Sequence, residues 1–141
     1  MRVLVMVPGN KDSEAGVLPD TKILTEMGKF NEELVKAGVM LAGEGLRPTS
    51  YAKRVKFAGD TPMVIDGPFT ESKEIVAGFW IWQVKSMDEA VAWLKKAPFG
   101  GGVQVEIRPI FEMEDFLASM PPDLAASEER MRAKSGLAER K

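Results

Sequence analysis

The sequence contains neither cysteine nor histidine. Without cysteine, the chain can form no disulfide and offers no thiolate nucleophile or sulfur ligand for a metal. Without histidine, it lacks the side chain that most often acts as a general base or binds a transition metal near neutral pH. Ser-His-Asp catalysis and zinc or haem bound through histidine are therefore excluded within one chain, and we expect no cofactor. Carboxylates, lysines, arginines, hydroxyls and one tyrosine remain for chemistry.

Charge of one sign and long hydrophobic runs are also scarce. The 19 basic and 21 acidic residues give a formal net charge of −2, without a conspicuous block of like charge. Because direct nucleic-acid binding normally requires a basic patch, we expect none. The apolar run from Arg2 to Pro8 is too short for a signal peptide, and no stretch approaches the ~20 apolar residues of a membrane helix. We expect a cytoplasmic protein without membrane contact.

Apolar periodicity divides most of the 141 residues into strands and helices of one domain, residues 1–116. Continuous or alternating apolar residues predict strands at 2–7, 39–42, 51–57, 62–65, 76–84 and 103–108. Helical spacing predicts one helix from Asp20 to Gly38 and another that starts at Ser86, where Ser86 and Glu89 form a capping box. Residues 117–141 are rich in Ala, Glu, Arg and Lys, which predicts a separate helical or flexible tail.

This order of elements predicts an α+β fold, a ferredoxin-like βαββαβ layer with an antiparallel sheet and both helices on one face. The strands at 2–7 and 76–84 are apolar on both faces. Two helices cover only one face, and the chain has no spare element for the other. A second copy of the sheet is the simplest cover, so we predict a homodimer.

Two carboxylates at strand ends are the candidates for acid/base catalysis. Asp66 opens the turn Asp66-Gly67-Pro68-Phe69. In one interpretation its carboxylate accepts hydrogen bonds from local backbone amides and Phe69 lies in the core. In the other, Asp66 lies at the mouth of a pocket. Glu44 lies between two glycines and is either an exposed strand-end charge or a site residue that ligands approach closely. If the two carboxylates converge, their repulsion raises one pKa and creates an acid/base pair.

Cations for a small carboxylate ligand are available at Arg54, Lys73 and Arg108, with the Phe69 ring beside them as a further binding candidate. Arg47 and Lys56 add to this supply. Taken singly, each of these side chains also fits an ordinary solvated surface. The aromatic residues Trp80 and Trp82 are more typical of a core or an interface than of a stacking platform, since basic residues are not interleaved with them.

Several short motifs are spread over residues 1 to about 115. They are Leu41-Ala42-Gly43-Glu44, Asp66-Gly67-Pro68-Phe69 with Glu71, Lys73 and Glu74, Gly78-Phe79, Ser86-x-x-Glu89-Ala90-x-x-Trp93 and Glu106-x-Arg108-Pro109. Together they resemble the YCII-related proteins of the DGPF type. The resemblance implies a dimeric α+β barrel, in which two ferredoxin-like sheets pack face to face.

The same resemblance implies two kinds of function. Some YCII-like relatives carry a histidine and aspartate pair proposed as an acid/base site, but the pair is incomplete in this histidine-free chain. Other DGPF proteins are encoded beside alternative sigma factors, which implies a regulatory association. Our main hypothesis is a homodimer that binds a small polar or acidic molecule near Asp66 and Glu44, with carboxylate catalysis optional. The alternative is a non-catalytic module that binds a protein partner, such as a transcription initiation factor, through the dimer surface and the tail of residues 117–141.

Overall fold

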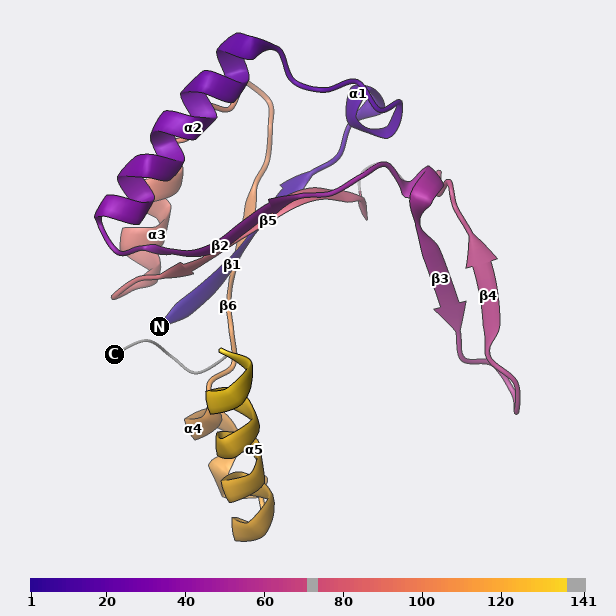
Figure 1. Cartoon of the computed structure of the whole chain (residues 1–141), viewed down its shortest axis with the longest axis vertical. Coiled ribbons are helices and arrows are strands. Elements are labelled where there is room, and N and C mark those ends of the chain that lie inside the picture. The colour runs from indigo at the N-terminus through magenta and orange to yellow at the C-terminus, as the bar shows by residue number, and fades with distance from the viewer. Residues whose placement is uncertain (71–73, 137–141) are drawn as a thin grey trace.

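The structure, a computed structural model, describes residues 1–70 and 74–136. Its elements in chain order are β1 (Arg2–Pro8), α1 (Lys11–Glu14), α2 (Thr21–Lys36), β2 (Met40–Gly45), the 3-10 helix η1 (Thr49–Tyr51), β3 (Lys53–Lys56), β4 (Met63–Asp66), β5 (Val76–Gln83), α3 (Met87–Leu94), β6 (Glu106–Pro109), α4 (Met113–Phe116), the 3-10 helix η3 (Leu117–Ser119) and α5 (Pro122–Ser135). Figure 1 shows their arrangement.

The main sheet has four strands in the order β2-β5-β1-β6, and each pair of neighbours is antiparallel. β3 and β4 form a separate two-stranded sheet. The main sheet is open and does not close into a barrel within the chain, because β2 and β6 remain its edges. The predicted α+β class and antiparallel sheet are confirmed, whereas the ferredoxin-like layout and the second copy stay predictions.

Local signals for the helices are mostly where the sequence predicts them. The Asp20 carboxylate accepts from the N–H of Ile23 at 2.8 Å and begins α2, and Gly38 follows its end with φ of 71°. Ser86 caps α3, but the Glu89 carboxylate accepts from the N–H of Lys85 instead of that of Ser86, so the capping box is wrong in this detail.

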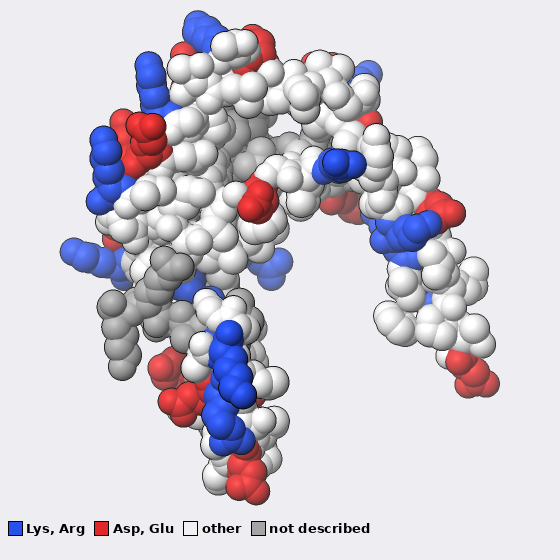
Figure 2. Space-filling model, viewed as in Figure 1, with Lys and Arg blue, Asp and Glu red and all other residues white. Residues whose placement is uncertain are grey.

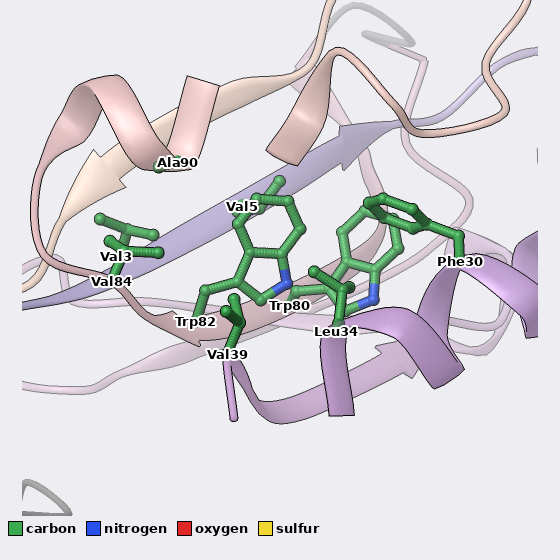
Figure 3. Close-up of a cluster of buried hydrophobic side chains, with 9 residues drawn as sticks. All are labelled: Val3, Val5, Phe30, Leu34, Val39, Trp80, Trp82, Val84 and Ala90. Carbon is green, nitrogen blue, oxygen red and sulfur yellow. The ribbon is translucent and has the colours of Figure 1, made fainter. Parts of the chain in front are cut away.

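The core lies between the sheet and the two helices α2 and α3, which cover one face (Figure 1). Trp80 and Trp82 of β5 pack side by side, with ring centroids 5.5 Å apart, and the Phe30 ring of α2 meets both edge-on (Figure 3). Val3 and Val5 of β1 point to the same side. Of the two places that the sequence predicts for these tryptophans, core or interface, both lie in the core.

In the described part of the chain, the opposite face of the main sheet carries no helix layer. Alternation along each strand and the strand register place five half-buried apolar side chains there, from Leu4, Met6, Ala42, Phe79 and Ile81, which we call the open face. Figure 1 shows α2 and α3 on the other side of the sheet. Apolar residues on both faces of β1 and β5 are thus confirmed.

An ion pair lies at one end of the open face. Arg2 is only 6% exposed, and its guanidinium donates two hydrogen bonds to the Glu112 carboxylate, at 2.9 and 3.0 Å. Glu112 in turn precedes α4, where its backbone N–H donates to the Asp115 carboxylate at 2.7 Å. This pair fastens the segment after β6 to the sheet.

Two arms project from the main sheet, the β3–β4 hairpin and the helix α5, and an open space separates them (Figures 1 and 2). α5 begins with Pro122 in its first turn, ends at Gly136 with φ of 72° and buries no residue. The predicted boundary between residues 116 and 117 stays a prediction. No helix in the described part of the chain is long and apolar enough to cross a membrane.

Candidate functional site

The turn Asp66-Gly67-Pro68-Phe69 packs directly on η1. The N–H of Gly67 donates to the carbonyl of Ala52 at 2.9 Å. A Cβ at Gly67 would lie 1.7 Å from the carbonyl oxygen of Thr49, so only glycine permits this contact. The turn is therefore held by backbone contact with a segment about 15 residues earlier, which local turn chemistry alone does not reveal.

A side-chain network completes this attachment. The Thr49 hydroxyl accepts from the N–H of Phe69 at 3.0 Å and donates to the Glu14 carboxylate, which also accepts from the N–H of Thr49 at 3.1 Å. Glu14 belongs to α1, a single turn capped by Asn10 within what the sequence predicts as a polar loop. Glu14 and Thr49 carry no motif that marks them, because they meet across 35 residues of sequence.

Asp66 lies on the exposed hairpin and forms an ion pair with Lys53, its register partner on β3. The side chains are 72% and 67% exposed, respectively, so solvent screens the pair strongly. This partner differs from the backbone amides that local chemistry favours. Phe69 is half-buried and lies outside the main core cluster, so of the two interpretations of the turn, the one with this ring in the core does not hold.

Glu44 lies on β2 at the open face, opposite Phe79 of β5. Its side chain is exposed. The glycine before it makes room for the core, because a Cβ at Gly43 would lie 2.7 Å from the Trp80 ring. Glu44 thus belongs to the main sheet and Asp66 to the hairpin, so the two carboxylates sit on different sheets.

An open cavity of about 520 Å³ lies between η1, the hairpin base and the start of β5. It is lined by Leu46, Arg47, Pro48, Thr49, Tyr51, Ala52, Lys53, Arg54, Phe69, Glu74, Ile75 and Val76. The lining includes neither Asp66 nor Glu44. It does bring together Arg54 and Phe69, two of the side chains that the sequence puts forward as ligand contacts.

Aromatic rings hold the two arginines of the cavity. The Arg54 guanidinium lies 3.7 Å from the centroid of the Phe69 ring, and that of Arg47 lies 5.3 Å from the Tyr51 ring. A ring face attracts a cation and fixes its orientation but leaves its N–H donors free for an anion. Within the described residues, neither arginine forms an ion pair with a carboxylate.

The remaining predicted contacts lie elsewhere. Lys73 falls outside the described residues. Arg108 is on β6, where its guanidinium is 3.9 Å from the Glu106 carboxylate, and it does not line the cavity. Sequence reasoning missed Tyr51 and Glu74 as cavity residues, since nothing in their spacing connects them to Arg54.

The cavity is organised for an anion more than for a metal. Glu74 is the one carboxylate in the described lining, against three cations. Across the described part of the chain, no three acidic side chains gather closely enough to hold a metal ion. Arginine forks match carboxylate oxygens in bidentate geometry, and the neighbouring rings offer an apolar wall.

The family model described as the YCII-related domain matches residues 1–114. The chain belongs to this family. The match runs from β1 to the start of α4 and so includes both the core and the cavity of this YCII-related protein. Among curated proteins, it is similar to an uncharacterised protein of Rhizobium meliloti (strain 1021), with 31% identity over 72 residues, or 51% of this chain and 58% of that protein.

Proposed function

We propose that this YCII-related protein is a homodimer of the DGPF type that binds a small organic acid in the cavity beside η1. The observation that carries the proposal is the pair of arginines, Arg47 and Arg54, each placed against an aromatic ring and free of a described carboxylate partner. A bound carboxylate supplies the counter-charge that neither arginine finds among the described residues. The Phe69 and Tyr51 rings favour an acid that also has a flat apolar part.

The proposed binding mode separates the roles of the lining residues. The Arg54 guanidinium lies over the Phe69 ring, and its N–H donors suit the bidentate recognition of a carboxylate. Lys53 is already paired with Asp66 and contributes mainly charge. The apolar side chains of Leu46, Ile75 and Val76 complete the wall.

Catalysis is a further step that the proposal does not require. A reaction by proton abstraction needs a base at the bound acid, and Glu74 is the carboxylate of the lining. The roles suggested for Asp66 and Glu44 need a ligand that extends beyond the cavity. We therefore place binding first and propose Glu74 ahead of those two residues as a base.

The homodimer and the ferredoxin-like layer belong to the same proposal. The strand order β2-β5-β1-β6 with α2 and α3 on one side supports the layer. The apolar open face supports a second copy as its cover, because a contiguous apolar surface of this kind marks an interaction site. The cysteine-free composition favours the cytoplasm as its location.

The test is isothermal titration of the full chain with a panel of small mono- and dicarboxylic acids. Charge-assisted hydrogen bonds contribute about 1.5–3 kcal/mol, so Arg54→Gln and Arg47→Gln should each weaken binding roughly tenfold or more. Arg130→Gln on α5 is the matched control and should bind as the wild type does. Absence of binding by the wild type, or equal affinities for all four proteins, would contradict the site.

The alternative function, a protein-interaction module, is favoured by one separate observation. Exposed apolar side chains run along the C-terminal part of the chain, from Phe116, Leu117, Leu124 and Met131. Binding of the full chain to a purified transcription initiation factor of the same organism tests this alternative. Leu124→Asp should abolish such binding, and an unchanged affinity would argue against the tail as the contact surface.

A further inference from the structure

The β3–β4 hairpin exposes apolar side chains that no other described residue covers. All eight residues of its two strands are exposed, and the Phe57 side chain in the turn region is 84% exposed. An isolated two-stranded hairpin is only marginally stable in water. Packing on another surface would therefore add most to the stability of this arm.

The register divides the hairpin into two different faces. Arg54 pairs with Ile65 and Lys56 with Met63, which places these four side chains on one face. Met63 is 56% and Ile65 39% exposed, so this face combines two apolar side chains with two cations. We call it the cationic face. Val55 and Val64 lie on the opposite face.

The open face of the main sheet has the complementary composition. Its centre is apolar, and Glu44 lies at its β2 side opposite Phe79, with Ile81 two residues further along β5. Glu44 forms no ion pair with any described cation, and Lys56 forms none with any described carboxylate. A cation next to apolar side chains on the hairpin thus matches a carboxylate next to apolar side chains on the sheet.

The hairpin does not reach the open face of its own chain. Figures 1 and 2 show that it points away from the main sheet, with open space between the hairpin and α5. Its base is fastened to α1, because the N–H and the hydroxyl of Thr49 both donate to the Glu14 carboxylate, so rotation toward the sheet would break these bonds. The complementary surface must come from another molecule.

We propose that the hairpin is an exchange arm. In the homodimer, each copy packs Lys56, Met63 and Ile65 of its cationic face against the open face of the second copy, where Lys56 meets the carboxylate of Glu44 and the apolar pair meets Phe79 and Ile81. This inference rests on the proposed homodimer and adds the element that holds it together. The contact occurs twice in a two-fold dimer.

The arm also links assembly to the proposed binding cavity. Lys53 and Arg54 belong to the hairpin and line the cavity at its base. Docking of the arm on the second copy fixes the strand that carries Arg54. A bound acid and the dimer contact therefore stabilise the same arrangement of β3, and each strengthens the other.

The experiment is sedimentation velocity of the full chain over a range of concentrations. Met63→Asp and Lys56→Glu should each raise the dimer dissociation constant about tenfold or more. Val64→Asp places the same charge on the same strand but on the other face, so its dimer should match the wild type. Because these side chains are exposed, all three variants should keep the wild-type circular dichroism spectrum.

Exchanging the charges of Lys56 and Glu44 tests whether these two side chains meet in the dimer. Glu44→Lys should weaken the dimer as Lys56→Glu does, and the double variant should recover most of the wild-type affinity. A mixture of the Met63→Asp and Glu44→Lys proteins should form a mixed dimer more readily than either forms its own, because only the mixed dimer retains one intact contact.

Two outcomes overturn the inference in different ways. A dimer that withstands Met63→Asp and Lys56→Glu but is weakened by Phe79→Asp would refute the exchange arm and leave the homodimer in place. A wild-type chain that stays monomeric at high concentration would refute the homodimer and the arm together.

Discussion

Gly67→Ala is the substitution that tests most directly how the turn is attached. The new Cβ would lie 1.7 Å from the carbonyl oxygen of Thr49 and 2.8 Å from its carbonyl carbon. Both are backbone atoms, so no side-chain rotation relieves the clash, and the turn must move away from η1. That movement breaks the hydrogen bond from Gly67 to Ala52 and the one from Phe69 to Thr49.

The expected loss of stability follows from the clash and the two broken hydrogen bonds. Overpacking of a tight contact costs about 1–3 kcal/mol, and each lost hydrogen bond adds about 1 kcal/mol. We expect a loss of about 3 kcal/mol, a large share of the ~5–15 kcal/mol of a typical domain. For a chain of this length such a loss corresponds to a fall in Tm of roughly 10 °C.

The assay is urea unfolding at one fixed protein concentration, followed by circular dichroism. Gly45→Ala is the control, since a Cβ there meets no atom within 4 Å, and its free energy of unfolding should stay within about 0.5 kcal/mol of the wild type. If Gly67→Ala is as stable as the control, the turn does not pack on η1 as described. Weaker acid binding by Gly67→Ala should accompany the loss, because the Phe69 ring under Arg54 moves with the turn.

Three further predictions concern single interactions. Glu112→Gln should lower the free energy of unfolding by about 1–3 kcal/mol, because it leaves the buried Arg2 guanidinium without its carboxylate. Asp66→Asn should change it by less than about 1 kcal/mol, because the pair with Lys53 is exposed. Gly28→Ala should raise the free energy of unfolding by about 0.5–1 kcal/mol, because Gly28 lies within α2 and the added methyl meets open space.

Urea unfolding at two ionic strengths checks all three. The effect of Glu112→Gln should persist in high salt, since a buried pair is screened little, and that of Asp66→Asn should vanish. Glu114→Gln, an exposed residue of α4, serves as the control for Glu112. A loss above 2 kcal/mol for Asp66→Asn would contradict the exposed pair, and a destabilised Gly28→Ala would show that α2 is packed more tightly there.

The elements of the main sheet were predictable because their signals are local. Alternation in β5 puts Trp80 and Trp82 on one face and Phe79 and Ile81 on the other, and the structure places the tryptophans in the core and the other two on the open face. β6 is shorter than predicted, since only residues 106–109 pair with β1. Val105 packs against the core as Ile107 does, whereas Val103 is 46% exposed. Alternation does not specify where pairing with a neighbour begins.

The candidate site was predictable only in part. Arg54 and Phe69 were selected by residue type, and the fold brings them into contact at 3.7 Å. Glu14 and Thr49 were missed because their role depends on contact between segments that are distant in the sequence. The turn motif of Asp66 does not reveal that its carboxylate faces a lysine on the neighbouring strand.

The amino-acid sequence by itself determined the fold class, the main helix boundaries and the presence of two apolar faces on one sheet, because propensity, capping and periodicity act over a few residues. The absence of histidine likewise excluded imidazole chemistry before any fold was considered. Only the tertiary structure decided that Asp66 and Glu44 lie on different sheets and that two arginines stand on aromatic rings around one cavity. Contacts of this kind depend on how strands and turns pack across long stretches of chain, and short-range patterns carry no information about that packing.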